Sequence, residues 1–125
     1  MRTLTKEWVD RVEGDHQAAS TLRAAPTPVL DAVCFHCQQT AEKYLKAWLP
    51  ERQISFPRTH DLEALARRAM PTLVELASLL PELRFLTSFA VEIRYPGTVA
   101  LESDADRCLA AANDLRALVR LRLGL

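Results

Sequence analysis

The chain has 125 residues, of which 49% are apolar and 26% are charged, and its formal net charge is zero. These values fit one soluble globular domain over residues 1–125 with a single core. Zero net charge excludes a strong overall attraction to nucleic acid or anionic lipid. No segment approaches the roughly 20 apolar residues that span a bilayer. The N-terminus carries charges where a secretory signal is apolar, so a cytoplasmic protein is expected.

Helical periodicity starts near the N-terminus and predicts two long helices in the first 50 residues. The first is expected from a Thr5 cap to about Ala24. The second begins at Pro28 after a Thr27 cap, runs to Leu49 and ends at Pro50. The inward face of this second helix is predicted to consist of residues at three- and four-residue steps: Val33, Cys34, Cys37, Ala41, Tyr44, Leu45 and Trp48.

Residues 50–59 contain two prolines and predict a loop, after which Thr59 can cap a short helix. A second short helix is expected over residues 72–79, followed by a longer helix that ends near Ile93. The Tyr95-Pro96-Gly97 sequence predicts a turn, because helical backbone geometry is unfavourable for a residue that precedes proline.

A last helix is expected from a Ser103 cap to about Leu123. The whole pattern predicts an all-α protein, an antiparallel up-and-down four-helix bundle with one or two extra short helices.

The second helix carries a polar stripe opposite its apolar one. At about 100° per residue, the centres of the two stripes lie roughly 160° apart. This geometry predicts that the polar stripe is free to meet solvent, a ligand or a partner chain. A solvated face with a Glu42–Lys46 pair, a ligand surface and a dimer contact all remain open. The stripe consists of His36, Gln39, Lys43 and Lys46.

Three cysteines at uneven spacing do not form a disulfide framework. Cys34 and Cys37 have Cys-x-x-Cys spacing, but both fall on the apolar stripe inside a helix, where free cysteine packs as a small apolar residue. A structural zinc needs four ligands, and no second cysteine pair is present. We therefore expect buried thiols, no metal and no cofactor.

Four segments together resemble the HEPN domain family of prokaryotes and higher eukaryotes. They are EWVDRVEGDHQAA in the first helix, FHCQQTAEKYLKAWL in the second, THDL after the proline loop and RYPG before the last helix. The resemblance implies an all-α bundle that forms a homodimer. It also implies a nucleotide ligand or a small separate nucleotidyltransferase as partner. Some members of that family are RNases or toxins, and others are inert binding modules.

The RNase branch of the family uses Arg-x(4–6)-His near the start of the last helix, and Arg94 corresponds to that arginine. The histidine would stand at position 99, 100 or 101, where this chain has Val99, Ala100 and Leu101. The same spacing occurs in the first helix between Arg11 and His16, which we interpret as coincidence. No catalytic residue is therefore assigned, because general acid–base chemistry most often needs a histidine within reach.

The leading hypothesis is a non-catalytic nucleotide- or substrate-binding module that acts with a separate minimal nucleotidyltransferase. One alternative is a divergent RNase toxin of a toxin–antitoxin pair that uses Arg94 with His60 or His36. Nucleic acid is an expected ligand only under that alternative. A second alternative is a structural dimeric interaction protein. The candidate ligand-binding residues are His36, Gln39, Lys43, Lys46, His60, Arg94 and Tyr95.

Overall fold

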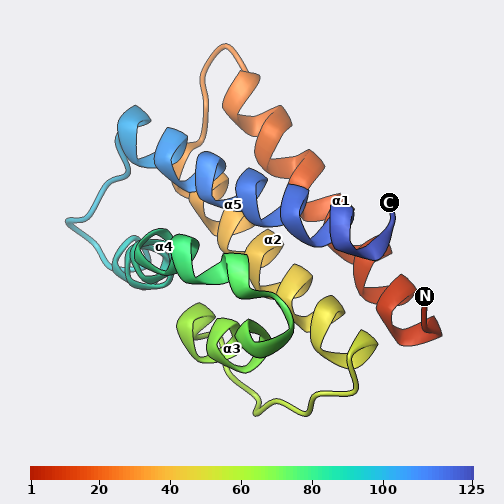
Figure 1. Ribbon diagram of the computed structural model, residues 1–125. Helices are drawn as coiled ribbons and strands as arrows, with labels where there is room; N and C mark the ends of the chain where they lie inside the picture. The colour runs from red at the N-terminus through yellow and green to blue at the C-terminus, as the bar shows by residue number, and fades with distance from the viewer.

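The computed structural model describes residues 1–125 and is helical throughout, with no strand (Figure 1). The predicted all-α bundle is confirmed. The elements in chain order are α1 (Thr3–Ala24), α2 (Leu30–Glu51), α3 (Leu62–Ala69), the 3₁₀ segments η1 (Met70–Thr72) and η2 (Val74–Leu79), α4 (Leu80–Glu92) and α5 (Glu102–Leu123).

Three helices of 22 residues, α1, α2 and α5, lie side by side, with α2 at the centre (Figure 1). Helix α1 runs antiparallel to both α2 and α5. Its C-terminal Arg23 pairs with Asp106 near the start of α5, and Arg2 at its N-terminus meets Glu51 at the end of α2. The fourth helix of the bundle, α4, has only 13 residues, and α3 packs beside it.

The apolar stripe predicted for α2 is the centre of the core. All seven of its residues are buried and belong to one cluster that takes residues from every helix. In α5, the buried residues include Ala105, Cys108, Leu115 and Val119. Burial of α2 on several sides follows from its position between α1, α3, α4 and α5.

The long helices begin at residues other than the predicted caps. Arg2 has extended backbone geometry, so α1 starts at Thr3 and Thr5 lies buried inside the first turn. Helix α2 starts at Leu30 after Val29, which leaves Thr27 and Pro28 outside it. Pro50 does not end α2, which continues to Glu51.

Side-chain capping differs from the prediction at two further helix starts. Asp61, rather than Thr59, caps α3 by accepting a 3.0 Å hydrogen bond from the Glu63 amide. The Thr59 hydroxyl accepts a hydrogen bond from the Asp61 amide instead. At α5, the Asp104 carboxylate accepts from the Leu101 amide, so Ser103 lies inside the helix and is not its cap. Both carboxylates also complement the partial positive charge of a helix N-terminus.

The turn between α4 and α5 forms where it was predicted, after Ile93. Gly97 has a φ of +96°, a left-handed conformation that a side chain disfavours. The Asp31 carboxylate of α2 accepts a 3.0 Å hydrogen bond from the Ala100 amide and fixes the end of this connection. The start of α2 is thereby held against the loop that precedes α5.

The three cysteines are buried and free, as expected. Cys34 of α2 and Cys108 of α5 belong to the same core cluster, and burial raises the pKa of the Cys37 thiol to about 12. A thiol that stays protonated is a poor nucleophile and metal ligand. No helix combines the length and apolar character needed to cross a bilayer.

Candidate functional site

The polar stripe of α2 is only partly exposed, and the Glu42–Lys46 pair expected for a solvated face is present. Helix α1 lies over part of it and supplies Asp15, which is itself only 12% exposed. One Asp15 oxygen lies 3.0 Å from His36 Nδ1, and the other accepts a 2.5 Å hydrogen bond from Lys43 Nζ. Two of the four stripe residues therefore help to attach α1 to α2.

The other lysine of the stripe belongs to a buried carboxylate cluster. Lys46 Nζ donates a 3.0 Å hydrogen bond to Glu42, whose side chain is 6% exposed. Gln38 Nε2 and His60 Nδ1 both meet the second Glu42 oxygen, at 3.1 Å and 2.8 Å. Gln39 donates to Gln38 and completes the network. Burial raises the pKa of Glu42, but the three donors outweigh it, and the net pKa lies below its ordinary value.

His60 is held by one ring nitrogen and exposed at the other. Its side chain is 82% exposed although Nδ1 contacts Glu42. An ionised carboxylate only accepts hydrogen bonds, so Nδ1 carries a proton and Nε2 of the neutral ring is available to an external group. His60 does not cap α3; Asp61 does.

Cationic side chains and an indole surround a hollow of about 420 Å³ between α1, α2 and the α2–α3 loop. Arg58 is exposed and forms no ion pair, whereas Lys46 reaches the hollow from its contact with Glu42. The hollow is lined by Trp8, Lys46, Phe56, Arg58, Thr59 and His60.

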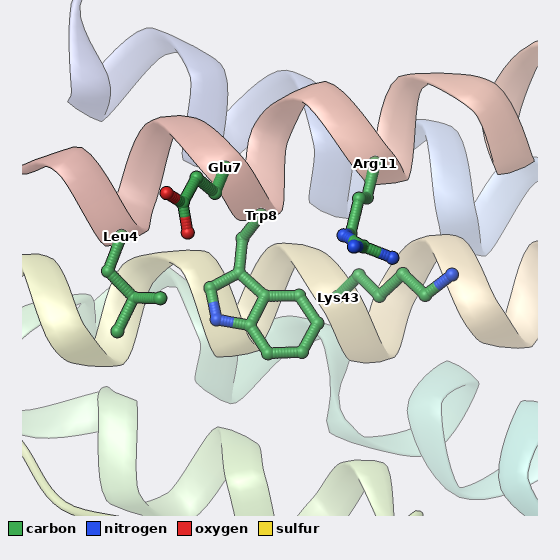
Figure 2. Close-up of a pocket in the computed structure, with 5 residues that line it drawn as sticks. All are labelled: Leu4, Glu7, Trp8, Arg11 and Lys43. Carbon is green, nitrogen blue, oxygen red and sulfur yellow. The ribbon is translucent and has the colours of Figure 1, made fainter.

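A second hollow of about 240 Å³ lies on the other side of the Trp8 indole. Figure 2 shows the ring over α2, between Leu4 and Arg11 of the same helix. Arg11 is exposed and has no ion-pair partner, and Lys43 of α2 also lines this hollow. The fifth residue is Glu7, an exposed carboxylate. Trp8 is thus flanked by positive side chains on both sides.

A third hollow, of about 220 Å³, brings together His60 and Arg94, which lie far apart in the sequence. Gln38 and Thr87 line it between them, and the exposed Arg94 has no ion-pair partner. Tyr95 is 66% exposed and does not line any of these hollows. The side chains of Arg94 and Tyr95 are both exposed and form no hydrogen bond within the chain.

Sequence reasoning missed the contribution of Trp8, Arg11 and Arg58 to these hollows. Trp8 is only partly buried and packs at the edge of the core. Arg58 lies in a loop, where periodicity does not indicate which way a side chain points. The signal that could have found it is its position next to the THDL sequence that includes His60.

A separate ionic network joins α1, α2 and α5. Glu13 accepts hydrogen bonds from Arg116 at 2.6 Å and 3.0 Å and from the buried Tyr44 hydroxyl at 2.5 Å. Arg116 is the main cause of a Glu13 pKa of about 2, with Tyr44 and Arg120 acting in the same direction against burial. Arg116 and Arg120 are both only partly exposed.

Comparison with known proteins decides the family. The HEPN domain model matches residues 5–122. The chain belongs to the HEPN domain family. A crystal structure described as that of an archaeal HEPN homologue superposes with a TM-score of 0.75, at 24% identity, over 97% of this chain and 98% of that one. No match is found among curated proteins.

The family assignment agrees with the resemblance inferred from the sequence motifs. In this HEPN domain the residues of those motifs form the Glu42 cluster and the hollows beside it. No group of three or more histidine, cysteine or acidic side chains has a metal-binding arrangement.

Proposed function

We propose that this HEPN domain is a non-catalytic module that binds a nucleotide or a related phosphate ligand next to Trp8. The observation that carries the proposal is the position of Trp8 between two hollows that are both lined by cations. An indole can stack on a base, and cationic groups bind phosphate oxygens. This combination in one place fits a ligand with an aromatic and an anionic part.

The distribution of charge supports the hollow with Arg58 as the phosphate subsite. The positive charge of Lys46 is already compensated by Glu42, but Arg58 has no acidic partner. The guanidinium group of an arginine can hold two phosphate oxygens at once. His60 adds an exposed ring at the same rim. No carboxylate lines this hollow, whereas Glu7 lines the hollow on the other side of Trp8. The base is therefore expected at Trp8 and the phosphates on the Arg58 side.

Replacing Arg58 by alanine is expected to weaken ATP binding by about tenfold or more, because a charge-assisted hydrogen bond is lost. Isothermal titration calorimetry with ATP, GTP and polynucleotides measures this. Lys6→Ala is the control, since Lys6 is an exposed cation of α1 that lines none of the hollows. Absence of binding by every ligand, or equal losses in both variants, contradicts the proposal.

The proposal includes two partners: a second copy of the chain and a separate minimal nucleotidyltransferase. The family relationship supports both. A pull-down with the product of the adjacent gene, assayed for nucleotidyl transfer, tests the second partner. Failure to recover such a protein removes this part of the proposal and leaves ATP binding as a separate result.

One observation favours a divergent RNase as the second candidate function. His60 and Arg94 line the same hollow within one chain, and Glu42 orients the His60 ring. A carboxylate-oriented histidine can act as a general base, and an arginine can stabilise phosphate charge. RNA cleavage and growth arrest by the wild type, both abolished in Arg94→Ala and in His60→Ala, would establish this function. No cleavage by the wild type rejects it.

A further inference from the structure

The ring of His60 is held by a buried carboxylate and is also open to a ligand. Its Nδ1 lies 2.8 Å from Glu42 Oε1, and its side chain is 82% exposed. His36 also meets a carboxylate, that of Asp15, but its side chain is only 28% exposed. Neither His36 nor His16 lines a hollow, whereas His60 lines two. His60 is therefore the histidine of this chain that is placed to react with a bound molecule.

Glu42 determines which nitrogen of the His60 ring can react. Lys46 and Gln38 also donate hydrogen bonds to this carboxylate, and both favour its ionised form. Because an ionised carboxylate only accepts hydrogen bonds, the proton of the neutral ring lies on Nδ1. The lone pair of Nε2 is then left without a partner in the chain. Nε2 is therefore the nucleophilic atom of the ring.

Each of the two hollows that His60 lines also contains an arginine without an acidic partner. Arg58 lines the hollow of about 420 Å³, and Arg94 lines the hollow of about 220 Å³. Both side chains are exposed, and neither forms an ion pair within the chain. Two guanidinium groups are thus available to the oxygens of a phosphoryl group that approaches Nε2.

A hydroxyl group adds a further donor in the Arg94 hollow. Thr87 Oγ1 accepts a 3.1 Å hydrogen bond from the Leu62 amide, so its own proton can be donated to a ligand. Asp61 is the one carboxylate that lines either hollow, and its Oδ1 accepts a hydrogen bond from the Glu63 amide. The surroundings of His60 therefore offer more donors than acidic groups to an anionic ligand.

We propose that His60 is a phosphorylation site at which Nε2 accepts a phosphoryl group from a small acyl phosphate. Histidine is one of the side chains that form covalent intermediates, and arginine stabilises the charge on a phosphoryl group in transfer. The two guanidinium groups donate hydrogen bonds but keep their protons. The donor that fits is therefore one whose leaving group needs no proton, as the carboxylate of an acyl phosphate does.

The step balances without a proton transfer. The lone pair of Nε2 forms the bond to phosphorus, while the bond from phosphorus to the bridging oxygen of the acyl phosphate breaks. That oxygen leaves with the bonding electrons as part of a carboxylate. The ring of His60 keeps its Nδ1 proton and gains one positive charge, which Glu42 compensates from 2.8 Å. Glu42 is a positioning residue, because it contacts the ring and not the donor.

This inference goes beyond nucleotide binding and does not depend on it, because an acyl phosphate has no base to stack on Trp8. It also differs from RNA cleavage, in which His60 would move a proton and form no bond to phosphorus. Calorimetry with ATP measures the first property, and incorporation of phosphorus from acetyl phosphate measures this one. Either proposal can therefore fail while the other holds.

The test is incubation of the full chain with acetyl phosphate, followed by phosphorus NMR and by mass spectrometry of the intact chain and its peptides. The wild type is expected to gain one phosphoryl group, located on His60. His60→Gln is expected to lose most of this incorporation, and His36→Gln is the matched control that retains it. No incorporation by the wild type, or an equal loss in both variants, overturns the proposal.

Replacing both arginines separates a built site from a merely exposed histidine. The double variant Arg58→Ala, Arg94→Ala is expected to be phosphorylated about tenfold or more slowly, because the phosphoryl oxygens lose both guanidinium groups. Lys6→Ala is the control, since Lys6 is an exposed cation that lines no hollow. A double variant that reacts as fast as the wild type overturns the proposal.

Glu42→Gln tests the positioning residue through the lifetime of the phosphorylated ring. A phosphorylated imidazole loses its phosphoryl group to water most readily while the ring is protonated. Glutamine does not hold the Nδ1 proton as a carboxylate does, so the variant is expected to form phosphohistidine more slowly and to keep it longer at neutral pH. The comparison is made where circular dichroism shows both proteins folded. An unchanged lifetime contradicts the role of Glu42.

Discussion

Replacing Glu42 by alanine is expected to lower the free energy of unfolding by about 3 kcal/mol, because removing one partner of a buried ion pair leaves the other uncompensated. The Lys46 side chain is only 12% exposed, and the Gln38 amide also loses its acceptor on Glu42. Urea unfolding followed by far-UV circular dichroism measures the change. This is the largest effect that we expect from a single polar side chain.

A double-mutant cycle separates the ion pair from simple loss of packing. Lys46→Ala in the Glu42→Ala background is expected to cost at least about 1 kcal/mol less than Lys46→Ala alone. His60→Ala is the matched control within the same cluster, and since that side chain is 82% exposed, we expect a change below about 0.5 kcal/mol. Strict additivity of Glu42→Ala and Lys46→Ala would contradict the buried pair.

Glu13→Gln is expected to destabilise the protein at neutral pH and to have progressively less effect as the pH falls. The folded pKa of about 2 lies below the ordinary value of 4.5. Ionised Glu13 therefore contributes stability above about pH 4.5, and this contribution disappears as the pH falls towards 2. Because Glu13 is 32% exposed, solvent screening reduces the contribution to about 1 to 2 kcal/mol.

The free energy of unfolding is measured for the wild type and for Glu13→Gln at several pH values. The contributions of the other acidic groups to stability then cancel in the difference between the two proteins. Glutamine keeps an acceptor for the Tyr44 hydroxyl and removes only the charge. Glu7→Gln on the same helix is the control, because Glu7 is exposed and has no ion-pair partner. A difference that stays constant from pH 7 to the acid limit would show that Glu13 does not stabilise the fold through its charge.

The helices and their inward faces could be predicted because apolar periodicity is a property of the sequence itself. The stripe of α2 illustrates this, since every residue assigned to it is buried. Helix starts were less predictable, because the residue that caps a helix depends on the path of the preceding segment and on its contacts with other helices. Arg2 is the N-cap residue of α1 although a threonine was available at position 5, and the Arg2 amide donates a hydrogen bond to Glu51 of a different helix.

The candidate site was only partly accessible to sequence reasoning. The spacing of Lys43 and Lys46 showed that they share one side of α2. It did not show that α1 would place Asp15 against Lys43, because that contact depends on how two helices are aligned along their length. Likewise, His60 and Arg94 line the same hollow only because the α2–α3 loop packs near the end of α4. Such pairs are separated by too many residues for periodicity to relate them.

The central position of α2 has a consequence for how proteins built this way can diversify. Twelve of its 22 residues are buried, and its lysines are bonded to neighbouring acids. A substitution there disturbs two or three adjoining helices at once, so few are tolerated. New specificities are therefore expected to evolve at the exposed edges of α1, in the segment around Arg58 and in the α4–α5 connection, while the middle helix changes slowly.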